Sequence, residues 1–233
     1  MDEKRRIIEM SDAKISGICG VDEAGRGPVI GPMVVAGVKV DDESALIKLR
    51  VRDSKKCTKA RREKLANKIK EICEWRVERI SAFEIDKMRE RMTINEIEVL
   101  YFSKIIADLR PSVAYVDSAD ANEMGFAIAL KSHLRACMGM DGEKISVISR
   151  HGADDIYAVV SAASIIAKVE RDAEIKRIEE ELGVEIGSGY PSDKRTVDFL
   201  LNWVREHGEL PPYTRKSWKT VKKIIYKVGH LDI

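Results

Sequence analysis

Short β-rich apolar runs alternate with longer segments of helical periodicity along this chain, and that order limits the folds open to it. Strand-like runs come first, at residues 15–21, 29–40 and 75–81, and a helix–strand–helix–strand series follows before a helical remainder. Such an order is typical of an α/β or α+β domain in which helices cover one mixed sheet. We therefore expect a single mixed sheet flanked by helices.

The helical segments differ in how their apolar residues are arranged. Residues 60–74 place apolar side chains on one face beneath a basic one, whereas residues 93–109 are apolar on two sides, which predicts a buried helix. The other predicted elements are strands at residues 112–116 and 145–148, helices at residues 123–137 and 154–182, and a helix capped by Ser192 or Asp193.

Composition indicates an ordinary globular protein. The chain has 233 residues, of which 44% are hydrophobic and 34% charged, enough for one core. No apolar run approaches the ~18 residues that span a bilayer, and the N-terminal stretch has no signal-peptide core, so we expect a cytoplasmic protein. The Pro211-Pro212 pair predicts a domain at residues 1–208 and a basic helical extension, packed on it, at residues 209–233.

Basic residues are concentrated in two stretches of a chain whose net charge is only +2. Residues 48–70 contain eleven Lys or Arg against two acids, and residues 211–227 contain six basic residues and no acid. This distribution indicates a surface that faces a polyanion. The charge pattern alone is equally compatible with a solvated helix face balanced by acids elsewhere.

Acidic residues stand at the ends of predicted elements, where a common site can form. Asp22 and Glu23 follow the first strand, Asp117 ends the strand that begins at residue 112, and Asp154 begins a long helix. Strand ends and helix starts on one edge of a sheet converge, so the four acids are predicted to cluster. Carboxylates held close together repel one another unless cations lie between them.

A divalent metal suits such a cluster of oxygen ligands. Mg²⁺ binds oxygen at about 2.0–2.1 Å and keeps several waters. Two ions about 3.5–4 Å apart can activate a water and stabilise the leaving oxygen of a phosphodiester. The sequence has no P-loop, no G-x-S-x-G elbow and no dinucleotide-binding glycine motif after a strand, so metal-assisted hydrolysis is the predicted chemistry. The pattern alone does not exclude Asp120, Asp155 and Asp172 as members of the cluster.

Six motifs, in one order across roughly residues 16 to 200, resemble the ribonuclease HII family. The opening motif is D-E-A-G-R-G at residues 22–27, and G-S-G-Y-P-S-D at residues 187–193 is similar to the family's tyrosine loop. Three further motifs are D-S-K-K at residues 53–56, T-I-N at residues 93–95 and V-D-S at residues 116–118. The sixth motif is a predicted helix that contains A-D at residues 153–154, Tyr157 and S-A-A-S-I-I-A-K at residues 161–168. The form is most similar to archaeal single-domain members.

The resemblance implies an RNase H-like α/β fold with a five-stranded mixed sheet and a C-terminal helical region that completes the substrate groove. It implies an endonuclease that hydrolyses the RNA strand of RNA–DNA hybrids and cuts on the 5′ side of single ribonucleotides embedded in duplex DNA. The products would carry a 3′-hydroxyl and a 5′-phosphate. The implied cellular roles are ribonucleotide removal from DNA and primer clearance, and we expect a monomer.

The resemblance also implies a role for each matching residue. The metal ligands, for Mg²⁺ or Mn²⁺, would be Asp22, Glu23, Asp117 and Asp154, since the A-D-x-x-Y spacing selects Asp154 over its neighbour. The loop formed by Gly25, Arg26 and Gly27 would read the ribonucleotide 2′-hydroxyl through backbone groups, and Tyr190 would pack on the sugar at the RNA–DNA junction. Phosphate contacts would come from Ser54, Lys55, Lys56 and Lys168. His151 matches no family role and is interpreted as structural.

Two features depart from the family pattern. The tail G-H-L-D-I at residues 229–233 lacks the aromatics of the sliding-clamp-binding motif that ends some archaeal relatives, so a clamp would be a partner only if this degenerate motif still binds it. The stretch around residues 138–142 is longer than in compact members, which predicts an extended surface turn.

Two other readings of the chain stay open. A ribonuclease HIII-like enzyme has the same core but carries an N-terminal substrate-binding domain, and only about fifteen residues precede the first strand here. A catalytically silent nucleic-acid-binding module would keep the fold and the basic surface. Such a module would gain nothing from four acids that face phosphate.

Overall fold

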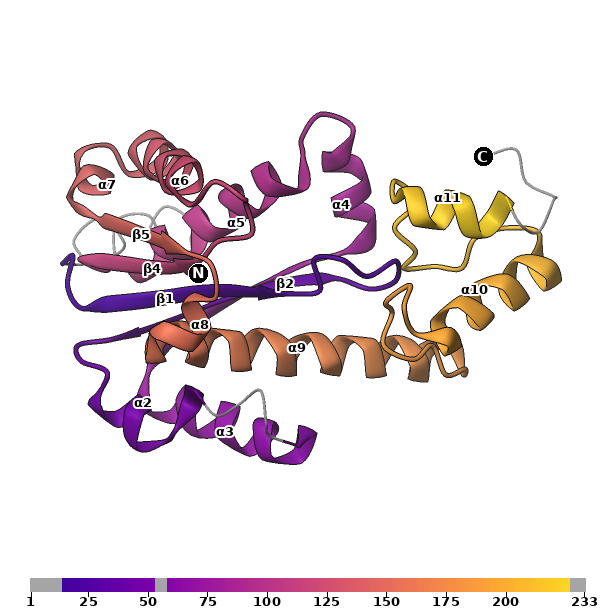
Figure 1. The fold of residues 1–233 in the computed structure, drawn as a ribbon, viewed down its shortest axis with the longest axis horizontal. Helices are drawn as coiled ribbons and strands as arrows, with labels where there is room; N and C mark the ends of the chain where they lie inside the picture. The colour runs from indigo at the N-terminus through magenta and orange to yellow at the C-terminus, as the bar shows by residue number, and fades with distance from the viewer. Residues whose placement is uncertain (1–13, 53–57, 227–233) are drawn as a thin grey trace, which may run out of the picture. The chain divides into compact units, whose positions relative to one another are not determined.

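The computed structural model describes residues 14–52 and 58–226, and these form two compact units. Within the described part, the first unit contains residues up to 23, residues 35–78 and residues 98–169. The second unit contains residues 24–34, residues 79–97 and residues 170 onward. Figure 1 labels the helices and strands of both.

A five-stranded sheet lies at the centre of the first unit, in the order β3-β2-β1-β4-β5. Strands β1, β4 and β5 are parallel. The connection between β1 and β2 is too short for the crossover that parallel neighbours require, so this pair is antiparallel and the sheet is mixed, as predicted. The bounds are β1 (Ile18–Ala24), β2 (Met33–Val40), β3 (Glu74–Ile80), β4 (Val113–Asp117) and β5 (Ser146–Arg150).

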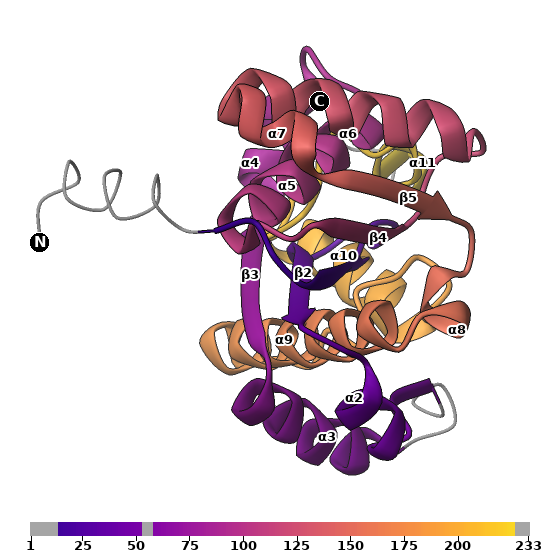
Figure 2. The ribbon, with the colours of Figure 1, turned by 90° about the vertical axis from the view of Figure 1, so that its left-hand side faces the viewer.

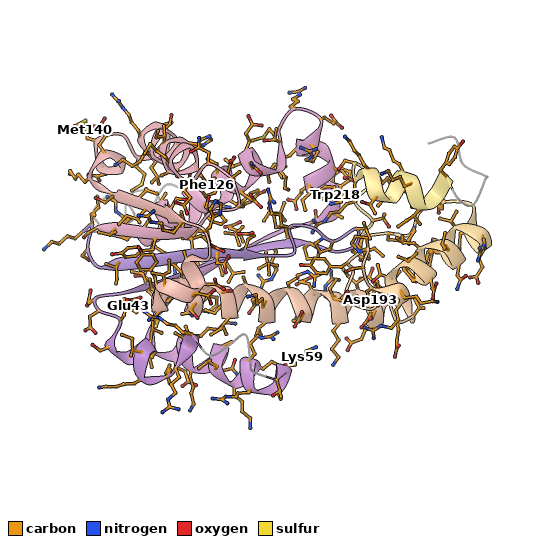
Figure 3. The ribbon with its side chains drawn as sticks, in the orientation of Figure 1. Glu43, Lys59, Phe126, Met140, Asp193 and Trp218 are labelled. Carbon is orange, nitrogen blue, oxygen red and sulfur yellow. The ribbon has the colours of Figure 1, made fainter. Side chains whose placement is uncertain are left out.

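Helices of the first unit cover both faces of the sheet, as Figures 1 and 2 show. On one face, α5 (Ile94–Leu109) packs against α6 (Glu123–Met138). The ring of Phe126, labelled in Figure 3, meets that of Phe102 edge-on with 5.6 Å between centroids. The other face is covered by the beginning of α9 (Ala158–Leu182), with α2 (Ser44–Lys48) and α3 (Lys59–Ile72) beyond it. The buried helix predicted over residues 93–109 is thus confirmed as α5.

The start of α9 lies directly against β1 because Gly20 has no side chain. A Cβ atom at Gly20 would lie 2.3 Å from the backbone of Val159 and Val160. The carboxylate of Glu43 accepts the Val159 N–H at 2.7 Å, so a residue distant in sequence caps the first turn of this helix.

The prediction of a single helical stretch over residues 154–182 is wrong in one respect. Tyr157 has an extended backbone (φ −108°, ψ 124°) and divides the stretch into α8 (Ala153–Ile156) and α9. The sequence shows no breaker at this point, since tyrosine is an acceptable helix residue. The division places Asp154 on a separate short helix at the end of the sheet.

Three short helices were not predicted: α2, α4 (Ala82–Arg89) and α7 (Met140–Lys144). The last of these lies where an extended surface turn was expected. Its Gly142 packs closely against α6, because a Cβ there would lie 2.2 Å from the carbonyl oxygen of Leu134. Helices of one or two turns contain too few apolar residues to reveal a period, which is why the sequence does not show them.

The second unit is helical and has a core of its own. It contains α4, the end of α9, α10 (Lys194–His207) and α11 (Lys219–Tyr226). The side chain of Asp193, labelled in Figure 3, accepts the Arg195 N–H and caps α10, which selects one of the two predicted caps. The predicted domain boundary after residue 208 stays a prediction. The core consists of Val29, Ile30, Ile178, Ile186, Phe199, Leu200, Val204, Leu210 and Val221.

Helices long and apolar enough to span a bilayer do not occur within the described ranges.

Candidate active site

Two of the predicted metal-binding carboxylates lie on neighbouring parallel strands of the first unit. The register pairs Val21 with Val116, so Asp22 and Asp117 follow at equivalent positions on β1 and β4. Asp22 is only 5% exposed. Burial disfavours its charged form and the negative charge of Asp117 adds to this effect, so the pKa of Asp22 rises from 3.8 to about 7.

A short polar chain from α9 opposes this rise in the pKa of Asp22. The hydroxyl of Ser164 hydrogen-bonds the Asp22 carboxylate, and the Lys168 ammonium, one turn further along, donates to Ser164 Oγ at 2.7 Å. The Asp22 carboxylate also accepts the Glu23 N–H at 2.8 Å. Lys168 therefore belongs to the hydrogen-bond network of Asp22, and its contact with phosphate stays a prediction.

Asp117 also organises the start of α8. Its Oδ1 accepts the N–H of Ala153 at 2.8 Å, and the next residue is Asp154. Asp154 is 8% exposed, whereas Asp155 is exposed to solvent. The buried aspartate is thus the one that the family spacing selects. Glu23, which follows Asp22 on β1, is half-buried.

The donor set is of the kind that a hard divalent cation prefers. All four candidate ligands are carboxylates, whose oxygen atoms suit Mg²⁺ and Mn²⁺. The raised pKa of Asp22 means that the folded chain stabilises the negative charge there poorly, and a bound cation would lower this pKa. Among the residues that the structure describes, however, no three His, Cys, Asp or Glu side chains converge in a way that could hold a metal ion. The four-carboxylate ligand set therefore stays a prediction.

The loop predicted to read the 2′-hydroxyl lies in the second unit, where Arg215 holds it. This arginine is completely buried, and its guanidinium donates to the carbonyl oxygens of Gly25 (2.6 Å), Arg26 (2.9 Å) and Gly31 (3.0 Å). No carboxylate forms an ion pair with it among the described residues. Burial, and then the charge of Arg171, lower the pKa of Arg215 to about 9.

Gly25 is required at its position in this loop. Its φ of +84° lies in the left-handed region, which side chains other than glycine rarely adopt. A Cβ atom there would also lie 2.7 Å from both the Pro32 carbonyl oxygen and the Arg171 Nε. Any other residue would therefore displace the loop from the arginines that surround it.

The tyrosine loop lies beside this loop within the same unit. The N–H of Val29 donates to the carbonyl of Gly189 at 2.8 Å, which ties the two segments together. A Cβ atom built on Gly27 would lie 3.7 Å from the Tyr190 ring. The guanidinium of Arg171 stacks over that ring at 5.0 Å and also donates to the Ser188 carbonyl at 2.6 Å. Tyr190 is half-buried, so part of its ring faces solvent.

Asp193 fixes the conformation of the tyrosine loop from its other end. Its carboxylate accepts the N–H of Ser188 at 2.8 Å while it caps α10. Hydrogen bonds from Arg195, and then from Ser188, hold the pKa of Asp193 well below its usual range. The loop is thus anchored at both ends by groups within one unit.

Sequence reasoning missed several residues that support these loops. Arg171 and Arg215 were counted only as members of basic or helical stretches, and Ser164 only as part of a motif. A buried arginine has no local signature, because the sequence around it resembles any exposed basic segment. Three predicted substrate contacts, Ser54, Lys55 and Lys56, lie outside the described residues.

Comparison with known proteins agrees with the fold and the motifs. A model of the family described as Ribonuclease HII matches residues 19–221. The chain is 51% identical to ribonuclease HII of Thermococcus kodakarensis over 215 residues, which cover 91% of this chain and 90% of the relative.

Two solved structures of archaeal relatives are also similar to this chain in fold and in sequence. The crystal structure of ribonuclease H2 from Pyrococcus horikoshii OT3 has a TM-score of 0.82 and 39% identity, covering 92% of this chain and 99% of that one. Ribonuclease HII from Archaeoglobus fulgidus, solved in complex with PCNA, has a TM-score of 0.81 and 43% identity, covering 89% and 96%.

Fold and sequence together define a hydrolase of the ribonuclease H type. The chain belongs to the ribonuclease HII family. This result sets aside both the silent binding module and the ribonuclease HIII-like reading.

Proposed function

We propose that this chain hydrolyses the RNA strand of RNA–DNA hybrids and cuts duplex DNA on the 5′ side of a single embedded ribonucleotide. The observation that carries the proposal is the loop of Gly25, Arg26 and Gly27. Arg215 engages the carbonyl oxygens of the first two of these residues, and Tyr190 lies alongside. A loop held by its carbonyls can present its N–H groups to a sugar hydroxyl. Membership of the ribonuclease HII family supports the hydrolytic activity.

Hydrolysis would depend on the four carboxylates that are predicted to bind metal ions. Asp22, Glu23, Asp117 and Asp154 would hold divalent ions, which supply an activated water and stabilise the leaving 3′-oxygen. Ser164 orients the Asp22 carboxylate, and the Ala153 N–H orients that of Asp117. The water oxygen would bond to phosphorus while the bond from phosphorus to the upstream O3′ breaks. One proton of the water would end on that O3′, which gives a 3′-hydroxyl and leaves the 5′-phosphate on the ribonucleotide.

The test uses a labelled DNA duplex with one ribonucleotide, and a second duplex with an all-RNA strand on DNA. Both are incubated with Mg²⁺, with Mn²⁺ and with EDTA. A cut immediately 5′ of the single ribonucleotide, lost in EDTA, supports the proposal. Cleavage of the all-RNA strand alone would refute the junction specificity, and cleavage in EDTA would refute the role of the metal.

Replacing Tyr190 should weaken cleavage at the junction more than it weakens the fold. Loss of ring packing on a nucleotide costs about 1–3 kcal/mol, so we expect Tyr190→Ala to lower kcat/KM on the single-ribonucleotide duplex by a factor of about 5 to 150. Tyr190→Phe keeps the ring and should retain most of the activity. If Tyr190→Ala melts so early that unfolding at the assay temperature explains its lost activity, the tyrosine only packs the loop.

A sliding clamp is a second candidate partner, suggested by the PCNA complex of the Archaeoglobus relative. The tail at residues 229–233 lies outside the described residues, and its sequence lacks aromatic residues. The tail is the predicted contact with a clamp, so clamp binding requires that deletion of residues 227–233 abolishes capture of the enzyme by its cognate clamp, and unchanged capture would refute it. Loss of capture on deletion, measured by pull-down, would show that the degenerate motif still binds.

A further inference from the structure

Side chains accept the backbone N–H groups of the loop that carries Tyr190. This loop, residues 183–193, connects α9 to α10 within the second unit. All five N–H groups from residue 186 to residue 190 donate to side-chain oxygens. A buried backbone N–H that is left without an acceptor is costly, so these oxygens favour one conformation of the loop.

Glu179, near the end of α9, holds the first part of this segment. Its Oε1 accepts the N–H of Ile186 at 2.8 Å and that of Gly187 at 3.1 Å. The Ile186 side chain is completely buried in the core of the second unit. The path by which the loop leaves α9 is therefore fixed both by a carboxylate and by an apolar side chain.

Thr196, in the first turn of α10, is completely buried and bridges two points of the loop. Its Oγ1 accepts the Gly189 N–H at 3.0 Å, and the same hydroxyl donates to the Ile186 carbonyl at 2.9 Å. A hydroxyl can donate and accept at once, which an apolar side chain of the same size cannot do. Thr196 thereby sets the separation between Ile186 and Gly189.

The backbone of Tyr190 continues directly from this bridge. Its N–H donates to Ser188 Oγ at 3.4 Å, and its carbonyl accepts the Asp193 N–H at 3.1 Å. The backbone on both sides of the tyrosine is thus held by neighbours within the loop. The direction of the ring depends on this backbone, and the backbone depends in turn on Glu179 and Thr196.

We propose that Thr196 and Glu179 are positioning residues that set the Tyr190 ring before substrate binds, and so determine how well the enzyme selects a single ribonucleotide. The inference rests on the proposed function, in which this ring packs on the sugar at the junction. A ring that is already in place loses little conformational freedom on binding, whereas a loop that must first become ordered weakens binding. Because Thr196 is buried, it acts through the loop and not by contact with nucleic acid.

Thr196→Val tests the proposal, because it removes the hydroxyl and nearly keeps the volume. It should lower kcat/KM about tenfold on the single-ribonucleotide duplex and less than about threefold on the all-RNA strand, since displacement of the ring matters only where the ring is used. Thr196→Ser restores the donor and the acceptor and should recover most of the loss. Activities are compared at a temperature at which circular dichroism shows every variant folded. An equal loss on both substrates would overturn the proposal.

Combination with Tyr190→Ala shows whether Thr196 acts through the tyrosine. If it does, adding Thr196→Val to Tyr190→Ala should change kcat/KM on the single-ribonucleotide duplex less than about twofold, because the ring to be positioned is already missing. Effects of the two substitutions that multiply would mean that Thr196 affects activity by another route, which contradicts the proposal.

Glu179 has a matched control in the next residue. Glu179→Ala removes the acceptor of two N–H groups, so it should lower kcat/KM on the single-ribonucleotide duplex about threefold to tenfold, whereas Glu179→Gln keeps an acceptor oxygen and should retain most of the activity. Glu180 is exposed and pairs with Lys176 on the surface of α9, so Glu180→Ala should leave the activity unchanged. Equal losses in Glu179→Ala and Glu180→Ala would remove Glu179 from the proposal.

Hydrogen exchange of the substrate-free enzyme tests the positioning without any hydrolysis. The amides of residues 186–189 should exchange more slowly than those of an unstructured peptide, by about tenfold or more, since each is hydrogen-bonded in the folded protein. The Gly189 amide should exchange faster in Thr196→Val. Wild-type amides that exchange at the unprotected rate would overturn the proposal. If protection is found while neither duplex is cut, the positioning of the loop stands and the proposed function falls.

Discussion

Asp22→Asn is expected to abolish hydrolysis and, at the same time, to raise the stability of the metal-free protein. The folded-state pKa of Asp22 lies near 7, above its ordinary value of 3.8, because burial and Asp117 disfavour the carboxylate. The cost of holding that charge is absent below about pH 4, grows as the pH rises, and is complete above about pH 7. Asparagine carries no charge and can still accept the Glu23 N–H.

The expected gain at pH 8 is about 2–4 kcal/mol, since a shift of one pKa unit corresponds to about 1.4 kcal/mol. The gain should shrink as the pH falls and disappear below about pH 4, where the wild-type carboxyl becomes protonated in both the folded and the unfolded state. Thermal unfolding in EDTA at the two pH values measures this difference. If Asp22→Asn melts at or below the wild-type temperature at pH 8, the buried charge of Asp22 does not destabilise the folded protein.

In the presence of divalent metal, the wild type should become more stable than Asp22→Asn. Ions that bind only the folded state stabilise it by mass action, so millimolar Mg²⁺ or Mn²⁺ should raise the melting temperature of the wild type more than that of Asp22→Asn. Asp155→Asn is the matched control, because Asp155 is exposed and is not a predicted ligand. That variant should keep most of the hydrolysis and show no gain in stability. Turnover near the wild-type rate in Asp22→Asn would refute its role as a ligand.

Arg215→Met should destabilise the second unit strongly and impair recognition of the ribonucleotide. Methionine preserves much of the buried volume but removes the donors to three carbonyl oxygens. Each buried acceptor left without a donor costs about 1–3 kcal/mol, and relief of the buried positive charge offsets part of the sum. We expect a net loss of about 3–5 kcal/mol in the free energy of unfolding.

Three variants separate the causes of this loss. Arg215→Lys keeps the charge but replaces the planar guanidinium with a single ammonium, so its stability should lie between those of the wild type and Arg215→Met. Arg205→Met, on the exposed side of α10, should change stability by less than about 0.5 kcal/mol. Urea unfolding and kcat/KM on the single-ribonucleotide duplex are the measurements. A wild-type unfolding midpoint in Arg215→Met would show that the three hydrogen bonds contribute little.

The predicted elements that were confirmed are those whose pattern is local. Apolar residues on two sides of the segment at residues 93–109 predicted a buried helix, and α5 is one. The run before Asp117 predicted a strand that ends on an acid, and β4 does so. Periodicity reports which face of an element is covered, and it requires only a few turns of chain. Where the pattern was too short, as in α4 and α7, prediction failed.

Breaks and caps that depend on distant residues were not predictable. Tyr157 interrupts a segment that is otherwise helical in character, and the new helix is capped by Glu43, which lies 116 positions away in the chain. No local propensity marks either event, because the competing conformation is stabilised only after the sheet has formed. The same reasoning explains why the role of Ser164 beside Asp22 was missed.

By itself, the sequence determined the family, the mixed sheet and the acids that stand at the ends of its elements, because motifs and hydrophobic periodicity depend on residues that are close together in the chain. Only the tertiary structure decided which charged groups are buried and what they contact. Arg215 stands in the sequence beside Lys216 and looks the same, yet it is completely buried while Lys216 is exposed. Its three acceptors lie more than 180 positions earlier in the chain, and burial of a charge is tolerated only where the folded backbone supplies such partners.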